Sequence, residues 1–430
     1  MIKNYIQRKL GRYAEEIVRK YHPLVIGVTG SVGKTSAKEA VFAALSSEEG
    51  VSTNSKNFNN EIGVPLSVLQ IHNSPRRSPG AWAVIFLKAR KLLKQHLPYP
   101  KILILEMGID HPGDMDYLAD MVKPQIAIVT AIGQAHIAYF GTEQRIAEEK
   151  TKIFKHLGTT GTSIINYDDS RLRSLLPKFN CKTLTYGTNS GADIRANSIN
   201  VAERNIGRKQ EWGTSSIIEY GKEHAELFLP GLIGSGHVLS CLAGIAAAIA
   251  TGISFSKAVE NLKNYKPQPG RMRLLPGVWN SLIIDDTYNS SPQAALLAIS
   301  ELQKFPSPNK IAVLGDMREL GTFSEQAHRD LALPLLKSGI NKVILVGNEM
   351  RSLALELAAI GYPRDQIAHF KNSFEVAKLI SKLATPETVF LVKGSQNTIR
   401  MERVVKALLR HPEQAGHLLV RQEDVWLKIK

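Results

Sequence analysis

The sequence predicts an α/β protein in which a central P-loop domain with a mostly parallel sheet precedes a C-terminal, Rossmann-like α/β domain. Three observations predict this class. A glycine-rich loop joins an apolar run to a helix-compatible run near the N-terminus. Apolar runs then alternate with helical stretches to about residue 180, and the alternation starts again after about residue 270. A chain of 430 residues can form two or three domains, and we expect them at 1–22, 23–269 and 270–430.

Residues 1–22 are predicted to form a basic amphipathic helix. Apolar residues recur at helical spacing along one stripe that contains Ile6, Leu10 and Ile17, while most basic residues lie elsewhere. Such a helix can pack against the first domain, or its basic face can contact a membrane surface. The sequence leaves both interpretations open.

A phosphate-binding loop is predicted at 27–35, after the apolar run at 24–26 and before a helix at 36–45. Glycines let backbone N–H groups point at phosphate oxygens, and the helix N-terminus adds the positive end of its dipole. Lys34 would reach the β- and γ-phosphates and Thr35 a Mg²⁺ ion. Val28 stands where this motif usually has its first glycine, so the alternative is a turn that binds no nucleotide. The nucleotide-contacting residues are expected to be Gly30, Ser31, Val32, Gly33, Lys34, Thr35 and Ser36.

A basic insertion within the central domain is predicted at about 72–100, as a loop followed by an amphipathic helix. It contains six Lys or Arg residues and no acidic residue, around the apolar run 81–87. The run is too short to span a bilayer. Either the helix covers the core, or it faces lipid or a partner protein.

Three polar residues follow the predicted strands or lie on the next helix. Glu106 ends the strand at 102–105, which suits a Mg²⁺ ligand. His136 follows the strand at 126–129 and could ligate a metal or orient phosphate, although a lone histidine is more often a hydrogen-bonded loop residue. From its helical context alone, Lys150 is interpreted as a solvated lysine.

The second half begins with short runs at 182–186, 215–220 and 226–229, which suggest antiparallel additions to the sheet. A small-residue helix at 237–251 and a linker at 266–270 follow, and four apolar runs then alternate with helices. Polar residues come directly after the linker and after the first strand. We expect γ-phosphate, ribose and adenine contacts from Arg271, Asp286, Tyr288 and Asn289; the alternative is an ordinary polar turn.

The composition of the chain limits the partners and the cellular location that we expect. The net charge of +15 favours an anionic partner, and no nucleic-acid-binding module is evident. Two cysteines suggest no disulfide framework, and neither a signal peptide nor a membrane-spanning run is visible. We therefore expect a cytoplasmic protein, with peripheral contact at the inner membrane face as an added option.

Several further motifs occur in a fixed order: 57–66, 105–108, 135–142, 150–154, 270–271, 285–292, 314–321 with His328, and 393–395. Together with the loop, they resemble the Mur ligase family. Within it they resemble the branch that adds D-alanyl-D-alanine to UDP-N-acetylmuramoyl-tripeptide. The likeness runs from about residue 22 to the end. It implies an ADP-forming amide ligase of peptidoglycan precursor synthesis, in which ATP phosphorylates an acceptor carboxylate and an amine then attacks the acyl phosphate.

The resemblance also implies residue roles. Lys34, Glu106, His136, Lys150 and Arg271 would be catalytic, with magnesium held by Thr35, Glu106, His136 and a carbamylated Lys150. The implied partners are a nucleotide-linked peptide acceptor and D-Ala-D-Ala, and a monomer is expected. Substrate contacts are expected from Asn59, Asn60, Asp316, Arg318, Glu319, His328, Lys393 and Ser395.

The sequence departs from the family pattern at three places. The loop begins after 26 residues, so the usual N-terminal UDP-binding domain is not expected. Val238 and Cys241 stand where the family has asparagines, and neither can make the amide contacts of asparagine. Gln396 replaces an expected arginine, although Arg400 follows. Two alternatives therefore stay open: a ligase for a non-uridylated or lipid-linked acceptor, and a non-catalytic nucleotide-binding scaffold.

Overall fold

The computed structural model describes residues 2–54, 58–73, 79–133, 137–176, 181–207, 209–395 and 399–427. The chain divides into two compact units. The first comprises residues 1–197, 217–225 and 239–267, and the second comprises 198–216, 226–238 and 268–430. Both contain largely parallel sheets with helices, so the predicted α/β class is confirmed.

The first sheet has the strand order β2-β3-β1-β4-β5-β6-β7-β8-β9. Neighbouring strands from β2 to β7 pair in parallel, including β6 with β5, so the antiparallel interpretation of 182–186 is wrong. A helix lies between β5 and β6 in the chain, and such a crossover returns the chain in the same direction. The strands are β1 Leu24–Thr29, β2 Val51–Thr53, β3 Ile102–Glu106, β4 Ile126–Val129, β5 Thr162–Asn166, β6 Lys182–Gly187, β7 Ile194–Ile206, β8 Lys209–Tyr220 and β9 Glu223–Pro230.

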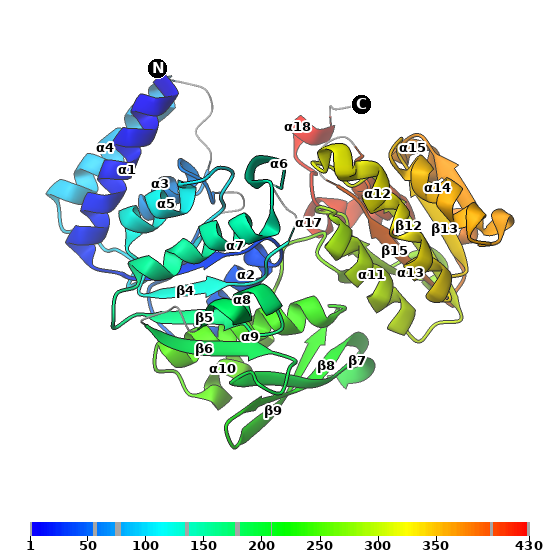
Figure 1. Cartoon of the computed structure of the whole chain (residues 1–430), viewed down its shortest axis with the longest axis horizontal. Helices are drawn as coiled ribbons and strands as arrows, with labels where there is room; N and C mark the ends of the chain where they lie inside the picture. The colour runs from blue at the N-terminus through cyan, green and yellow to red at the C-terminus, as the bar shows by residue number, and fades with distance from the viewer. Residues whose placement is uncertain are drawn as a thin grey trace. The chain divides into compact units, whose positions relative to one another are not determined.

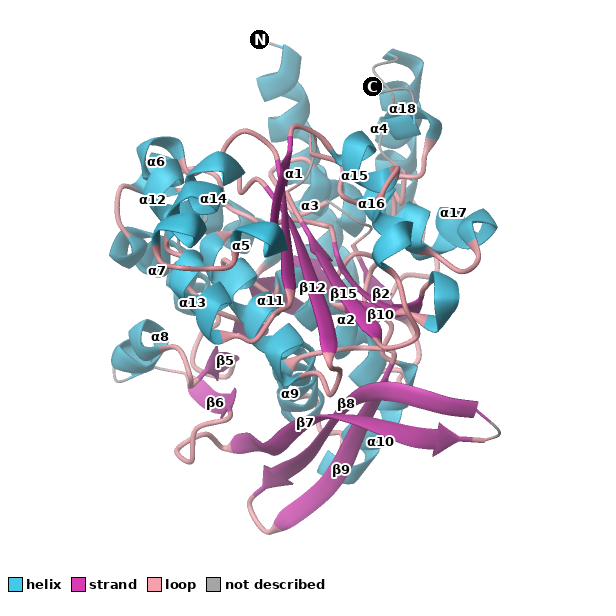
Figure 2. Cartoon of the chain, turned by 90° about the vertical axis from the view of Figure 1, so that its right-hand side faces the viewer, coloured by secondary structure: helices cyan, strands magenta, loops and turns pink. Residues whose placement is uncertain are grey.

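The last three of these strands form a long twisted ribbon (Figure 2). Gly221 and Lys222 alone join β8 to β9, and a two-residue connection requires an antiparallel hairpin. The expected antiparallel additions are therefore found here.

Helices of the first unit cover both faces of its sheet. Alternate strand residues such as Val25, Leu103 and Ala127 face a core built with α1, α3, α4 and α5, while α2 contacts β1, β2 and β3. The helices of this part of the chain are α1 Ile2–Tyr21, α2 Lys34–Ala44, α3 Gly63–Val68, α4 Pro79–Lys94, α5 Asp114–Val122, α6 Ile137–Phe140, α7 Glu143–Thr151, α8 Ser170–Leu175, α9 Ser235–Ala250 and α10 Phe255–Asn261.

The second sheet has the order β10-β11-β15-β12-β13-β14, with only the edge strand β10 antiparallel. One face packs against α11 to α14 and the other against α15 to α17. Its elements are β10 Arg273–Pro276, β11 Leu282–Asp286, β12 Asn309–Gly315, β13 Lys342–Val346, β14 Ile367–Phe370, β15 Thr388–Lys393, α11 Pro292–Lys304, α12 Ser324–Arg329, α13 Ala332–Lys337, α14 Met350–Ala359, α15 Ser373–Ala377, α16 Glu402–Leu408, α17 Ala415–Leu418 and α18 Asp424–Leu427.

Candidate functional site

The glycine-rich loop joins β1 to α2 and lies against the end of β4. Gly30 has φ 144°, and a Cβ there would lie 2.0 Å from Thr130 Oγ1, so only glycine fits. Thr130 Oγ1 donates to Val32 O at 2.6 Å, which fixes the loop. Gly33, with φ 85°, precedes the first helical residue, Lys34. Lys34 Nζ lies 2.9 Å from Gly30 O, inside the curve of the loop, and Thr35 and Ser36 continue the first helical turn.

Glu106 lies next to this loop because β3 pairs with β1 in the register Val28↔Glu106. Asn54 bonds to the Glu106 backbone on both sides, and Lys38 Nζ donates to Asn54 O at 2.8 Å. Asn59 Nδ2 donates to Glu106 Oε1 at 2.9 Å. The carboxylate is therefore held in one orientation.

The second carboxylate oxygen of Glu106 suits a metal ion. Glu106 Oε2 and Thr29 Oγ1 are buried without a hydrogen-bond partner among the described residues. A buried oxygen without a donor is costly, and a hard cation such as Mg²⁺ would satisfy it. Within the described ranges no three His, Cys, Asp or Glu side chains already form a metal cluster. His136, one of the four expected magnesium ligands, lies outside the described residues.

Lys150 is buried, with 1% of its side chain exposed, so the solvated-lysine interpretation is wrong. Burial, followed by the nearby positive charge of Lys34, lowers the pKa of Lys150 well below its ordinary value, although Asp110 and Glu149 oppose the shift. The neutral amine is thereby favoured. A neutral amine is the form that adds CO₂, so the local chemistry fits a carbamate.

In the second unit, the predicted residues gather at the carboxyl ends of β11 and β15. Lys393 Nζ lies 2.6 Å from Asp286 Oδ2 and donates to Asn289 O at 3.0 Å. The Arg271 guanidinium lies 4.0 Å from the centre of the Tyr288 ring, a cation–π contact. Arg271 Nε is buried without a hydrogen-bond partner among the described residues.

His237 fixes the backbone of this arginine. Its Nε2 lies 2.8 Å from Arg271 O, and burial lowers the pKa of His237 to about 4, so the ring is neutral at pH 7. The neighbouring departures from the family pattern, Val238 and Cys241, are both fully buried. Burial raises the pKa of the Cys241 thiol, which makes it unreactive.

A second group of predicted residues follows β12 and β15. Asp316 is buried, which raises its pKa; its Oδ1 accepts from Met350 N at 3.0 Å, and Ser395 Oγ donates to Asp316 O at 2.5 Å. His328 is buried and accepts from Met317 N at 3.0 Å through Nε2. Arg318 and Glu319 are exposed beside them.

The remaining expected contact, Asn60, lies in the turn before α3, where its Oδ1 accepts from Ile62 N and Gly63 N. Arg400, in contrast, lies buried beside Glu402, while Gln396 lies outside the described residues. The sequence did not point to Lys38 or Asn54. Asn54 follows β2, a strand that the sequence did not reveal either.

No described helix is both long and apolar enough to cross a bilayer.

Two family models match the chain. The model described as "Mur ligase middle domain" matches residues 87–248, and the model described as "Mur ligase, glutamate ligase domain" matches residues 270–396. Together they match more than half of the chain.

Similar proteins of known name agree with these matches. The UDP-N-acetylmuramoyl-tripeptide–D-alanyl-D-alanine ligase of Bacillus subtilis is 28% identical over 94% of this chain and 79% of its own length. That of Synechocystis is 29% identical over 90% of this chain and 74% of its own length. The crystal structure of the MurF ligase of Thermotoga maritima with ADP is 27% identical, covering 95% of this chain and 84% of the other, at a TM-score of 0.76. The chain belongs to the Mur ligase family.

Proposed function

We propose that the protein is an ATP-dependent, ADP-forming amide ligase of peptidoglycan precursor synthesis, which adds D-Ala-D-Ala to a UDP-MurNAc-tripeptide-like acceptor. One observation carries the proposal: the glycine-rich loop lies beside the buried Glu106 carboxylate, whose Oε2 has no hydrogen-bond partner among the described residues. The relatives named for this reaction match along most of their length.

The reaction joins two half-steps. An acceptor carboxylate oxygen attacks the γ-phosphorus of ATP, and the bond to the β-phosphate oxygen breaks to release ADP. The amine nitrogen of D-Ala-D-Ala then attacks the acyl phosphate carbon; phosphate leaves, the amide forms and the amine proton is lost. We assign the loop amides and Lys34 to the β- and γ-phosphates, where positive charge stabilises the transferring group.

We assign the Mg²⁺ ligands to Thr35, Glu106, His136 and Lys150, the last as a carbamate. When bound, Mg²⁺ supplies charge neutralisation at the phosphates. Arg271 and Asp286, with Tyr288 and Asn289, are assigned to ATP from the second unit. The carbamate is tested with the Lys150→Ala variant: added short carboxylic acids should restore part of its activity, whereas no restoration and no bicarbonate dependence would contradict it.

The central experiment measures ADP release with UDP-MurNAc-tripeptide and D-Ala-D-Ala. The Lys34→Ala variant should lose activity by at least about 10²–10³-fold, whereas Lys155→Ala, on an exposed side chain of the same unit, should not. Release at the wild-type rate by Lys34→Ala would reject the loop assignment. A wild-type protein that binds ADP but never turns over with any amine would instead be a nucleotide-binding scaffold.

A second candidate keeps the ligase and changes the acceptor to a non-uridylated or lipid-linked peptide. It is favoured by the helical pair α1 and α4, which lie side by side in the first unit (Figure 1). The Tyr13 and Phe86 rings are 6.1 Å apart, and Lys20 Nζ donates to Leu92 O at 2.8 Å. Assays with matched acceptors that carry or lack the UDP group decide between the two; strict UDP dependence would reject the second.

The same pair carries our proposal of peripheral contact with an anionic membrane at its cytoplasmic face. Val84 and Leu87 on α4 are 65% and 61% exposed, and α4 contains no acidic residue. A groove of about 340 Å³ on α1 is lined by Tyr5, Arg8, Lys9, Arg12, Tyr13 and Glu16. Exposed apolar side chains on a helix that also carries basic residues suit the interface of an anionic bilayer.

Vesicle sedimentation tests this contact. The monomeric protein should bind vesicles of phosphatidylcholine with phosphatidylglycerol, more weakly at high salt. The Lys91→Glu/Lys94→Glu variant should bind at least about tenfold less, and Lys222→Glu, on the exposed β8–β9 turn, should bind normally. Equal binding to neutral vesicles, or no effect of the double charge reversal, would reject the contact. Light scattering of the same samples tests the monomer.

A further inference from the structure

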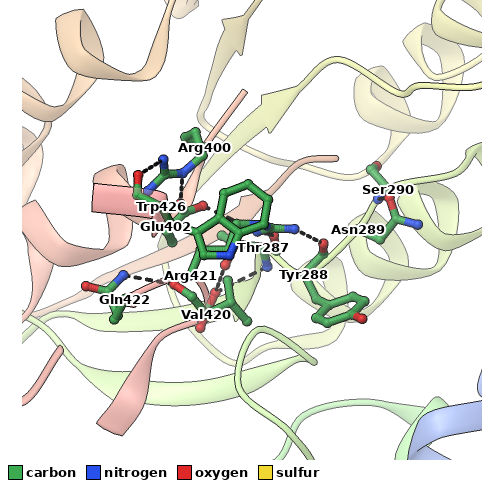
Figure 3. A network of polar contacts seen from close by, with 11 residues as sticks. Thr287, Tyr288, Asn289, Ser290, Arg400, Glu402, Val420, Arg421, Gln422 and Trp426 are labelled. Atoms are coloured by element: carbon green, nitrogen blue, oxygen red, sulfur yellow. Dashed lines mark hydrogen bonds and ion pairs between the residues drawn. The ribbon is translucent and has the colours of Figure 1, made fainter. Parts of the chain in front are cut away.

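The C-terminal segment at 419–427 lies against the loop that follows β11. Arg421 donates from Nη1 to Thr287 O at 3.1 Å and from Nη2 to Tyr288 O at 2.6 Å. Figure 3 shows this guanidinium between the C-terminal segment and the two backbone carbonyls. One planar side chain thus bridges two successive carbonyls of a loop that is more than 130 residues away in the sequence.

Arg421 is itself fixed by a buried charge network. Its Nη1 lies 3.4 Å from Glu402 Oε2, and the other oxygen of Glu402 pairs with Arg400. Glu402 and Arg400 are 1% and 2% exposed. Arg400 Nη1 donates to Trp426 O at 2.6 Å, and both guanidinium groups lie within 6 Å of the Trp426 ring, at 5.7 and 5.8 Å from its centre. A buried network of charged hydrogen bonds of this kind restricts its members to one geometry.

The loop held in this way carries residues assigned to the nucleotide. Two arginines lie near the Tyr288 ring, with the Arg271 and Arg421 guanidinium groups at 4.0 Å and 5.9 Å from its centre. Tyr288 N donates to Gly270 O at 3.0 Å, and a Cβ on Gly270 would lie 3.1 Å from Val420 Cγ1. The C-terminal segment therefore contacts both the loop and the backbone that precedes Arg271.

We propose that Arg421 is a positioning residue, which fixes the backbone of Thr287 and Tyr288 so that the Arg271–Tyr288 pair is preorganised for the nucleotide. This inference rests on the proposed function. Arg421 acts only through the loop. By ordering the loop beforehand, it reduces the conformational entropy that is lost when the nucleotide binds. It therefore affects the affinity for ATP more than the rate at which the bound complex reacts.

The test compares Arg421→Gln with Arg410→Gln in the full chain. Arg410 is the matched control because it also donates to a backbone carbonyl, Gly277 O, but at the opposite end of β11. Arg421→Gln should raise the Kd for ADP and the KM for ATP roughly tenfold, the size expected for losing charge-assisted hydrogen bonds. It should change kcat little, and Arg410→Gln should change none of these values.

Hydrogen exchange of the amides at 287–291 gives a readout independent of catalysis. They should exchange faster in Arg421→Gln than in wild type or Arg410→Gln. If Arg421→Gln does not fold, Trp426→Leu, which removes the ring beside both guanidinium groups, should give the same changes in smaller measure. Unchanged loop exchange, or unchanged ADP affinity despite a loosened loop, would overturn the inference while leaving the ligase intact. A wild-type protein that neither binds ADP nor turns over ATP would overturn the proposed function itself.

Discussion

The phosphate loop of the first unit and the β11 loop of the second unit differ in how their polar groups are satisfied. Beside the phosphate loop, Glu106 Oε2 and Thr29 Oγ1 are buried without a partner among the described residues. At the end of β11, Asp286 is paired with Lys393, and Arg421 with Glu402. Only Arg271 Nε and Asp285 Oδ2 lack partners there, within the described chain.

This difference separates two ways of building a binding surface. Groups left unsatisfied cost stability and can be completed by a ligand, as we propose for a cation beside Glu106. Groups paired with one another keep a loop in place before any ligand arrives. A substitution of Glu106 should therefore lower activity without a loss of stability. A substitution in the Asp286–Lys393 pair should lower stability first.

The largest expected effect is a loss of stability in the second unit. Asp286→Asn leaves the buried Lys393 ammonium without its counter-charge, which should lower the free energy of unfolding by about 3–5 kcal/mol. The double variant Asp286→Asn/Lys393→Met removes both charges and should recover most of that loss. Urea unfolding of the single and double variants measures it. A single variant as stable as wild type would mean that the pair is not the stabilising contact, and the comparison would fail.

A smaller effect, in activity only, is expected at Glu106. Glu106→Gln keeps the shape of the side chain but removes the negative charge offered to Mg²⁺. ADP release should fall about 10²–10³-fold. The melting temperature should stay equal or rise, because the charge is removed from a buried oxygen that has no partner within the described chain. Glu48→Gln, on an exposed side chain, is the control. A melting temperature that falls with the activity would place Glu106 among the structural residues instead.

Most of the fold could be predicted because buried parallel strands form continuous apolar runs, as in β3 and β15. Strands without such a run were missed. β2 has three half-buried residues, and β14 contains an exposed histidine. The prediction that 182–186 is an antiparallel addition to the sheet was also wrong, because the direction in which β6 pairs with β5 depends on the crossover and not on the strand sequences.

The residues of the candidate site likewise divide into those that the sequence could predict and those that it could not. Loop 27–35 is local, so its pattern is visible in the sequence. The role of Arg421 could not be found, since the two backbone carbonyls that it contacts lie 133 and 134 residues away and no spacing rule links them. Lys150 was first interpreted as solvated, yet Ile146 precedes it by four residues on the buried face of α7. That spacing was the available signal.

The smallest expected effect concerns Lys150 and depends on pH. Because burial lowers its pKa in the folded state, the unfolded chain binds more protons than the folded one at pH values between the lowered pKa and 10.5. Stability should therefore rise with pH in this window on account of Lys150.

The Lys150→Met variant has no titrating amine and so lacks this pH dependence. Its advantage in stability over wild type should be largest at neutral pH and should shrink as the pH rises toward 10.5. Urea midpoints at pH 7 and pH 9, in buffers freed of CO₂, measure the difference, and Lys155→Met is the exposed control. If the advantage of Lys150→Met grew with pH, the folded state would be holding Lys150 as a cation, and the amine could not be the CO₂ acceptor that we propose.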